Sequence, residues 1–301
     1  MFKGYDHAAA KESLLKWTST RINAEFSKPN ICKLLHDTSD INSICGGTPT
    51  AWRLVTNPRE PEEVVFKIQG VIVFSELPPF TKQLGKKASA AVLRQGITLT
   101  GFGSQAFEDG INGIKIADLL LRRNVPQLDS TPLSCTDELD GHQALHLSNR
   151  YFLSRRLANG ETSVDLDPVV DPYGILKKVG GTDFVHTAEN IVEYEKVKKA
   201  DDKEIIFESI SPAVFRVGDV VEAQFTLMMV PTGRNGKPPY KSFATLRSIT
   251  LLDDTYSKKY EIEKIVVSRS NTTLKRSAGN WQETEELTTK QMRGMDIGGR
   301  A

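Results

Sequence analysis

The sequence predicts an α+β protein: a mixed α/β region over residues 1–160, a mostly antiparallel β sandwich or barrel over 161–262, and a largely disordered tail over 263–301. Helix-like spacing of apolar residues is confined to the first region. After Asn159-Gly160, short alternating segments separated by turn residues take its place, which is typical of a small sandwich or barrel. The tail is rich in Ser and Thr and lacks a sustained period, so we expect it to be mobile.

Charge changes at the same point in the chain. The 301 residues carry 39 Lys and Arg against 38 Asp and Glu, a net charge of +1. Residues 161–222 hold 7 basic and 14 acidic side chains, a net charge of −7, and the balance comes from mildly basic flanks. This shift supports a domain boundary near residue 160 and bears on partners rather than on fold.

Composition excludes several classes of protein. The apolar fraction of 39% and the 22 Gly and 14 Pro exclude a collagen, a low-complexity chain and a wholly disordered one. No apolar run approaches the roughly 18 residues of a membrane helix, so we expect no membrane contact. Three widely spaced cysteines and the lack of a secretory signal in the first residues predict an intracellular protein, cytoplasmic or nuclear.

The first region alternates helices and strands. The clearest helix places Leu15, Thr18 and Ile22 on one face. The predicted elements are a helix over 9–27, strands over 51–55 and 64–74, a helix over 86–94, a strand over 97–100 and a helix over 111–123. Residues 142–158 admit a helix or a strand, and we favour a helix.

The second region reads as strands over 191–197, 204–210, 219–230 and 242–252. In the third strand, Val221, Ala223 and Phe225 alternate with polar residues. Asn235-Gly236 lies between the last two strands, and both residue types tolerate positive φ. The last two strands are therefore predicted to form a hairpin.

Three motifs in this region resemble a known family: FVHTAEN at 184–190, FRVGDVVE at 215–222 and LRSI at 246–249. In this order they resemble an uncharacterised, many-copy protein family of mushroom-forming fungi, over about residues 168–255. The shared positions are strand and turn residues. The resemblance therefore implies no activity for this chain.

Candidate catalytic and metal-binding residues are few. Cys45 precedes two glycines and could act as a nucleophile if His142, His146 or His186 supplied a base. Cys135 with His142 and His146 could bind a metal if the two histidines shared a helix face. An inert thiol and surface histidines are the commoner explanation of both patterns, and no motif requires a cofactor, so we expect none.

A glycine-rich turn and the predicted hairpin are the remaining candidates for ligand binding. Gly101-Phe102-Gly103-Ser104-Gln105-Ala106 fits a dinucleotide-binding pattern, but no acidic residue closes a second strand about 20 residues later, which favours a plain turn. The hairpin interleaves cations with aromatic residues, a pattern that suits single-stranded nucleic acid. Its candidate ligand-binding residues are Arg234, Lys237, Tyr240, Lys241 and Arg247.

We therefore expect a non-enzymatic intracellular binding or adaptor protein whose β-domain recognises protein or nucleic acid. A protein partner or a second copy of the chain is the expected partner, with nucleic acid as an alternative opposed by the near-neutral charge. The competing hypotheses are an enzyme with a Cys/His site assembled from distant loops, and a self-recognition or toxin-like factor.

Overall fold

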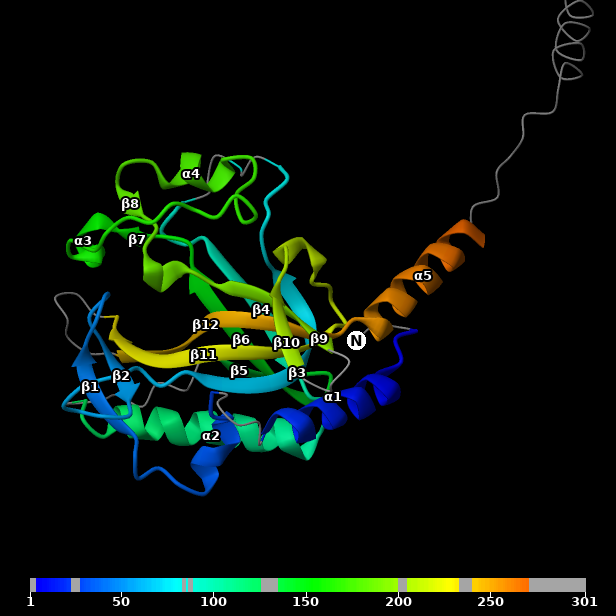
Figure 1. The fold of residues 1–301 in the computed structure, drawn as a ribbon, viewed down its shortest axis with the longest axis horizontal. Coiled ribbons are helices and arrows are strands. Elements are labelled where there is room, and N and C mark those ends of the chain that lie inside the picture. Colours follow the sequence, from blue (N-terminus) through cyan, green and yellow to red (C-terminus); the bar gives the residue numbers. More distant parts are fainter. Residues whose placement is uncertain are drawn as a thin grey trace, which may run out of the picture. The chain divides into compact units, whose positions relative to one another are not determined.

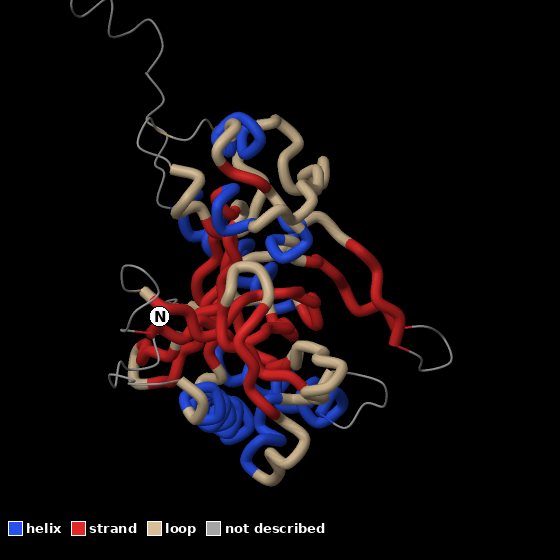
Figure 2. The backbone as a smooth tube through the Cα atoms, turned by 90° about the vertical axis from the view of Figure 1, so that its left-hand side faces the viewer, coloured by secondary structure: helices blue, strands red, loops and turns tan. Residues whose placement is uncertain are grey.

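The computed structural model describes residues 4–22, 28–82, 85, 89–125, 135–199, 205–232 and 240–270. The chain forms two compact units, Met1–Tyr260 and Glu261–Ala301. Within the first unit, helices pack on a sheet of ten strands, which confirms the predicted α+β class. Figure 2 shows the strands between helices at either end.

Five strands form the centre of the sheet, in the order β12-β11-β3-β4-β6. They are β3 (Phe66–Glu76), β4 (Arg94–Thr100), β6 (His142–Arg150), β11 (Val220–Pro231) and β12 (Tyr240–Asp253). Neighbours in this order are antiparallel. β6 returns to β12, where the Asn149 side chain donates to the Leu246 carbonyl over 3.1 Å. The five strands therefore close into a barrel.

Shorter strands extend the sheet. β9 (Glu193–Lys199) pairs in parallel with β12, and β10 (Ile205–Ser209) pairs with β9 at one edge. β5 (Thr136–Leu139) pairs with β6 at the other edge. β1 (Asn42–Gly46) pairs with β2 (Ala51–Val55), which reaches β11, and β7 (Leu153–Ser154) with β8 (Phe184–Val185) makes a separate two-stranded sheet.

Helices cover the barrel. α1 (His7–Ile22) and α2 (Gln105–Arg122) pack on its strands, and α3 (Arg155–Ala158) and α4 (Ile175–Gly180) accompany β7 and β8 on the other side from α2 (Figure 1). Three 3-10 helices are η1 (Ile31–Leu35), η2 (Ala188–Asn190) and η3 (Pro212–Val214). α5 (Thr255–Ser270) follows β12.

The apolar core lies between α2 and the strands. Ile114, Ala117 and Leu121 are buried, as the helical period predicts. A Cβ on Gly113 would lie 2.2 Å from the Ile31 carbonyl oxygen, so α2 and η1 pack backbone to backbone. Phe66 and Phe225, on adjacent strands, meet inside the barrel with ring centroids 6.3 Å apart.

Several predicted elements match the structure closely. α1, β2, β3, β4 and α2 each overlap their predicted ranges in the first region. All four predicted strands of the second region are present as β9 to β12. Pro231 pairs with Tyr240, which confirms the hairpin, although residues 233–239 lie outside the described part of the chain.

Other predictions were wrong. The helix favoured over 142–158 is strand β6 as far as Arg150, because pairing with β4 and β5 on its two sides outweighs a weak helical period. Only 155–158 are helical there, as α3. Of the helix predicted over 86–94, residues 86–88 are not described, 90–92 form a turn, and Arg94 begins β4.

The chain is also continuous where a boundary was expected. Strands from both sides of residue 160 pair in one sheet, since β11 pairs with β3, so the predicted division there marks no break in the sheet. In the predicted tail over 263–301, residues 263–270 belong to α5, and 271–301 lie outside the described residues.

A cluster of buried polar side chains joins α1 to the sheet. The Arg21 guanidinium donates two hydrogen bonds, of 2.7 and 2.9 Å, to the carboxylate of Glu222, which is fully buried on β11. Gln69 on β3 donates to the same carboxylate over 2.7 Å. Lys67, also buried, donates to the Arg21 carbonyl over 2.5 Å, and burial lowers its pKa.

Replacing Glu222 tests how much this buried cluster stabilises the protein. Removing one partner of a buried ion pair leaves the other charge uncompensated, so we expect Glu222→Gln to lower the free energy of unfolding by about 3 kcal/mol. Glu208→Gln is the control, because Glu208 pairs with Lys198 at the surface over 3.2 Å; its expected cost is below about 0.5 kcal/mol. Urea denaturation measures both, and equal losses would contradict the expectation.

Asp219, which is buried directly before β11, should make the stability of the protein depend on pH. Its carboxylate accepts from the Arg216 amide over 2.7 Å and from the Ser257 hydroxyl. Burial raises its pKa to about 6, although both hydrogen bonds oppose the shift. Because the folded state holds this proton more tightly than the unfolded chain does, the stability that it contributes is full below pH ~4 and is lost as pH rises through 6.

Because of Asp219, we therefore expect the free energy of unfolding to fall by up to about 3 kcal/mol as the pH rises from 4 to 7.5. Asp219→Asn cannot ionise, so its stability should vary less with pH than that of the parent chain over this interval. Urea denaturation at several pH values measures this, with the exposed Asp165→Asn as the control. An unchanged pH profile in Asp219→Asn would refute the assignment.

Candidate functional site

The predicted catalytic residues lie apart. Cys45 is exposed on β1, opposite Trp52 of β2. His142 stands beside the Phe102 ring, with centroids 6.5 Å apart, and Nδ1 of buried His186 lies 2.7 Å from the Tyr151 carbonyl oxygen. Among the described residues, no hydrogen bond connects Cys45 with a histidine. These candidates lie on different elements: Cys45 on β1, His142 and His146 on β6, and His186 directly after β8.

The predicted metal ligands do not form a cluster, although the Cys135 carbonyl accepts from the His146 amide over 2.7 Å. His142 and His146 lie on strand β6 and not on a helix, and four residues along a strand span about 13 Å. Cys135 is buried in the core, where burial raises the pKa of its thiol to about 12. No group of three candidate ligands forms within the described part of the chain.

The glycine-rich turn joins β4 to α2, as its position in the sequence predicts. Phe102 and Gly103 have φ values of 48° and 69°. A Cβ on Gly101 would lie 2.2 Å from Cβ of Phe107, so close packing of the turn on α2 accounts for this glycine. The Gly103 carbonyl accepts from Lys11 over 3.0 Å.

The hairpin residues have different surroundings. Arg234 and Lys237 lie outside the described residues. Tyr240 packs against the core. The Lys241 ammonium lies 5.6 Å from the centroid of the Phe243 ring, a cation–π contact on the same strand.

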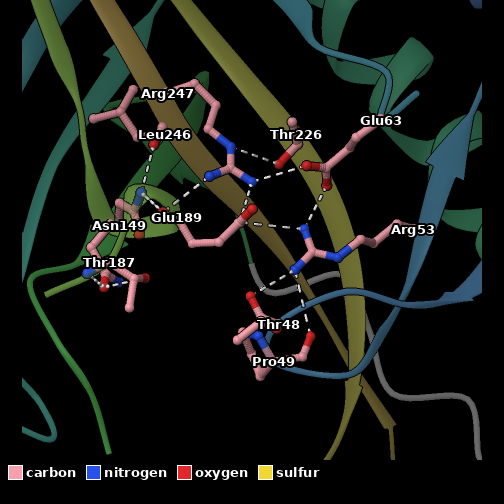
Figure 3. Close-up of polar contacts among 11 residues, drawn as sticks. Thr48, Pro49, Arg53, Glu63, Asn149, Thr187, Glu189, Thr226, Leu246 and Arg247 are labelled. Carbon is pink, nitrogen blue, oxygen red and sulfur yellow. Dashed lines mark hydrogen bonds and ion pairs between the residues drawn. The ribbon is translucent and has the colours of Figure 1, made fainter. Parts of the chain in front are cut away.

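Arg247 belongs to an ion-pair network that Figure 3 shows. Its guanidinium contacts the carboxylates of Glu63 at 3.0 Å and Glu189 at 2.9 Å, and also donates to the Glu189 carbonyl. Arg53 contacts the same two carboxylates at 2.8 and 3.6 Å. Two positive charges therefore meet two negative ones, and the charge of Arg247 is neutralised within the protein.

Two other arginines lie together without such partners. Arg94 of β4 and Arg150 of β6 are direct neighbours in the antiparallel register. Arg94 donates to the Ser148 hydroxyl over 3.4 Å, and its guanidinium lies 5.8 Å from the Phe243 ring centroid. Neither arginine forms an ion pair with any residue that the structure describes. Burial, and then the charge of Arg150, lower the pKa of Arg94.

An aromatic ring and small polar groups share this surface. Phe74 of β3 pairs with Thr98 of β4, and its side chain is 50% exposed. The Thr98 hydroxyl lies 3.3 Å from Nδ1 of His146. Burial and Arg94 lower the pKa of His146, against the opposing effect of Glu76.

We name this surface the β4–β6 face. Its outward side chains come from alternate positions of β3, β4 and β6, together with the adjoining part of β12, whereas Ile97 and Leu147 point into the core. It presents three cations and two aromatic rings, with Glu76 as a carboxylate at its border. The residues of the β4–β6 face are Phe74, Arg94, Thr98, His146, Ser148, Arg150, Lys241 and Phe243.

Sequence reasoning singled out Lys241 and His146 from this face and missed its two arginines. Arg94 fell in a predicted helix over 86–94 and Arg150 in one over 142–158. The alternation of Gln95, Ile97 and Leu99 about Arg94 was the signal that could have placed Arg94 on a strand surface. The two arginines are close only because β4 pairs with β6, and no pattern in the sequence indicates that pairing.

No described helix is both long and apolar enough to cross a membrane. No family model matches the chain, and a search of the curated proteins gives no match. Among solved structures, the chain is similar to gp2.5, a single-stranded DNA-binding protein encoded by bacteriophage T7. The identity is 11% over 63% of this chain and 86% of that chain, with a TM-score of 0.30.

A single-stranded DNA-binding protein from bacteriophage Enc34 matches at 11% identity over 70% of this chain and 88% of its own, with a TM-score of 0.32. Its C-terminal truncation matches at 10% identity over 71% and 95%, also with a TM-score of 0.32. These TM-scores are low, so the likeness does not define a common fold.

Proposed function

We propose that this protein binds single-stranded nucleic acid on the β4–β6 face. The observation that carries the proposal is the pair Arg94 and Arg150, two like charges adjacent on neighbouring strands with no carboxylate partner among the described residues. By contrast, Arg21, Arg53 and Arg247 each contact at least one carboxylate. A like-charged pair of this kind favours an anion from outside the protein.

Phosphate suits this pair of arginines. A guanidinium donates two parallel hydrogen bonds to a phosphate group, with a geometry that lysine lacks. Binding a polyanion to arginines also releases condensed counterions, which adds a favourable term that weakens with salt. Lys241 supplies a third positive charge at the edge of the face.

The aromatic rings favour a single strand over a duplex. Phe74 is half exposed, beside strand positions that carry Thr98 and His146. An unpaired base can stack on such a ring, whereas a base inside a duplex is already stacked on its neighbours. The ring of Phe243 makes cation–π contacts with both Arg94 and Lys241.

The strand order supports the same surface. In five-stranded barrels of the oligonucleotide- and oligosaccharide-binding kind, ligands bind on the face of the second and third strands and on the adjoining loops. β4 and β6 are the second and third strands of this barrel, and the β11–β12 loop with Arg234 and Lys237 adjoins Lys241 in sequence. Fold alone assigns no function, so the arginine pair remains the deciding feature.

Removing the arginine pair tests the electrostatic part. For Arg94→Gln with Arg150→Gln, we expect affinity for a fluorescent oligothymidine to fall at least about tenfold at low salt. The slope of log affinity against log salt should become shallower by about 1.4, because two phosphate contacts are lost. Fluorescence anisotropy measures both quantities.

Arg156→Gln is the matched control for charge, since Arg156 is exposed on α3 and is not one of the residues of the β4–β6 face. It should leave the affinity and the salt slope unchanged. Circular dichroism checks that each variant folds. The proposal fails if the parent chain binds no oligonucleotide at low salt, or if the double variant binds as tightly as the parent.

Replacing Phe74 tests the stacking part separately. Phe74→Ala should weaken single-strand binding about tenfold, from the 1–3 kcal/mol of a base–aromatic stack, and leave the salt slope unchanged because no charge is lost. Phe74→Trp, which retains a stacking surface, should restore binding. Competition with duplex DNA of the same length measures strand preference, and equal affinity for duplex and single strand would contradict a role in stacking.

A further inference from the structure

The β4–β6 face carries a row of three side chains in addition to its arginine pair. Phe74 of β3 pairs with Thr98 of β4, and Thr98 pairs in turn with His146 of β6. Residues that pair directly in neighbouring antiparallel strands point to the same face, with their Cβ atoms about 5 Å apart. The Phe74–Thr98–His146 row therefore places an aromatic ring, a hydroxyl and an imidazole side by side across three strands.

The three side chains of this row are accessible to solvent. Phe74 and His146 are exposed, and Thr98 is partly exposed. The core lies on the other side of the strands, where Ile97 and Leu147, the adjacent residues of β4 and β6, are fully buried. The polar groups of the row can therefore contact a ligand that lies on the β4–β6 face.

Thr98 and His146 form one hydrogen-bonded pair. Oγ1 of Thr98 lies 3.3 Å from Nδ1 of His146, and in the part of the chain that the structure describes, neither side chain makes a further hydrogen bond. Partial burial and then the charge of Arg94 lower the pKa of His146, so the ring is neutral near neutral pH. A neutral imidazole carries a single proton, on Nδ1 or on Nε2.

Both tautomers of His146 leave one donor and one acceptor facing outward. With the proton on Nε2, the Thr98 hydroxyl donates to Nδ1, so Nε2–H is the free donor and Oγ1 is the free acceptor. With the proton on Nδ1, the ring donates to Oγ1, so the hydroxyl is the free donor and Nε2 is the free acceptor. The pair therefore matches a partner that also presents a donor beside an acceptor.

An unpaired nucleobase has such an edge. The Watson–Crick edge of each of the four bases combines N–H donors with oxygen or nitrogen acceptors, and proteins bind this edge in single strands. In a duplex the opposite base occupies the same edge. A base that stacks on Phe74 has the Thr98–His146 pair beside it, because these residues hold the next two positions of the row.

The arginine pair lies at a distance from this row. Arg94 and Arg150 are each four residues along their strands from the row, which is about 13 Å. Gly96, midway along β4, has no side chain to separate the two parts of the face. Phosphate contacts position a strand, and base contacts sense its bases. The face can therefore hold the backbone and a base of one strand at the same time.

We propose that Thr98 and His146 bind the Watson–Crick edge of an unpaired base that stacks on Phe74. This inference rests on the proposed function, since it assigns the contacts of a base on the same face. The row accepts any of the four bases whose edge is free. The ligand class is therefore nucleic acid with unpaired, unmodified bases, whatever its sequence.

A chemically blocked oligonucleotide tests this contact. In an oligomer of N3-methylthymidine, a methyl group replaces the N3 hydrogen, so the base still stacks and the phosphates keep their charge, but the edge loses its donor. We expect the parent chain to bind it about fivefold more weakly than oligothymidine of the same length, the loss of one hydrogen bond of about 1 kcal/mol. Fluorescence anisotropy at one salt concentration measures both affinities.

The two proposals fail in different ways. Equal affinities for the two oligomers would overturn the role of the Thr98–His146 pair and leave the proposed function intact. Absence of binding to oligothymidine would refute the proposed function, and the role of the pair would fail with it.

Variants assign the effect to the pair. Thr98→Val with His146→Leu removes both outward polar groups and should bind the two oligomers equally, whereas Thr98→Ser keeps a hydroxyl and should retain the preference of the parent. Thr136→Val is the matched control and should also retain it, because Thr136 of β5 pairs with Leu145, whose side chain lies in the core. Circular dichroism checks that each variant folds. A double variant that discriminates as strongly as the parent would overturn the inference.

Discussion

The side chain of Asn149 joins the two strands that close the barrel, and the β4–β6 face depends on that closure. Asn149 is buried between two outward residues of β6, and its Nδ2 donates to the carbonyls of Leu246 and Glu189. One amide therefore joins β6 to β12 and to η2. Arg150 follows it directly on the outer face, and η2 carries Glu189 into the ion-pair network.

β4 carries different side chains on its two faces. Arg94 faces outward beside a second arginine, and Gln95, the next residue, faces inward, where its Oε1 accepts from the Tyr194 hydroxyl over 2.6 Å. A chain with a net charge of +1 can present this basic surface because the acidic stretch at 161–222 supplies none of the residues of the β4–β6 face.

Local signals in the sequence were sufficient for the strands whose alternation is strong. β11 alternates apolar and polar residues from Val221 to Leu227, and the Asn-Gly turn after it predicted the pairing with β12. β6 was missed because residues 142–158 fit a helix as well as a strand when they are taken alone. Its strand state comes from two neighbours distant in sequence, β4 and β5.

The β4–β6 face was less predictable than the strands, because it arises from pairing across long sequence separations. Arg94 and Arg150 become neighbours only through the β4–β6 register, and Arg247, which looked free for a ligand, is neutralised by Glu63 and Glu189. The net charge of the chain does change near residue 160, but strands from both sides of that residue pair in one sheet.

The contacts of α1 have a practical consequence for shortening the chain. Tyr5 donates to the Gly218 carbonyl, Arg21 neutralises Glu222, and Lys67 reaches the last turn of the helix. Cutting away the first 22 residues would remove the Arg21 guanidinium that neutralises Glu222 and the Arg21 carbonyl that Lys67 contacts. Both charged side chains would then lose their cover by α1. A folded fragment of this protein should therefore retain its N-terminal helix.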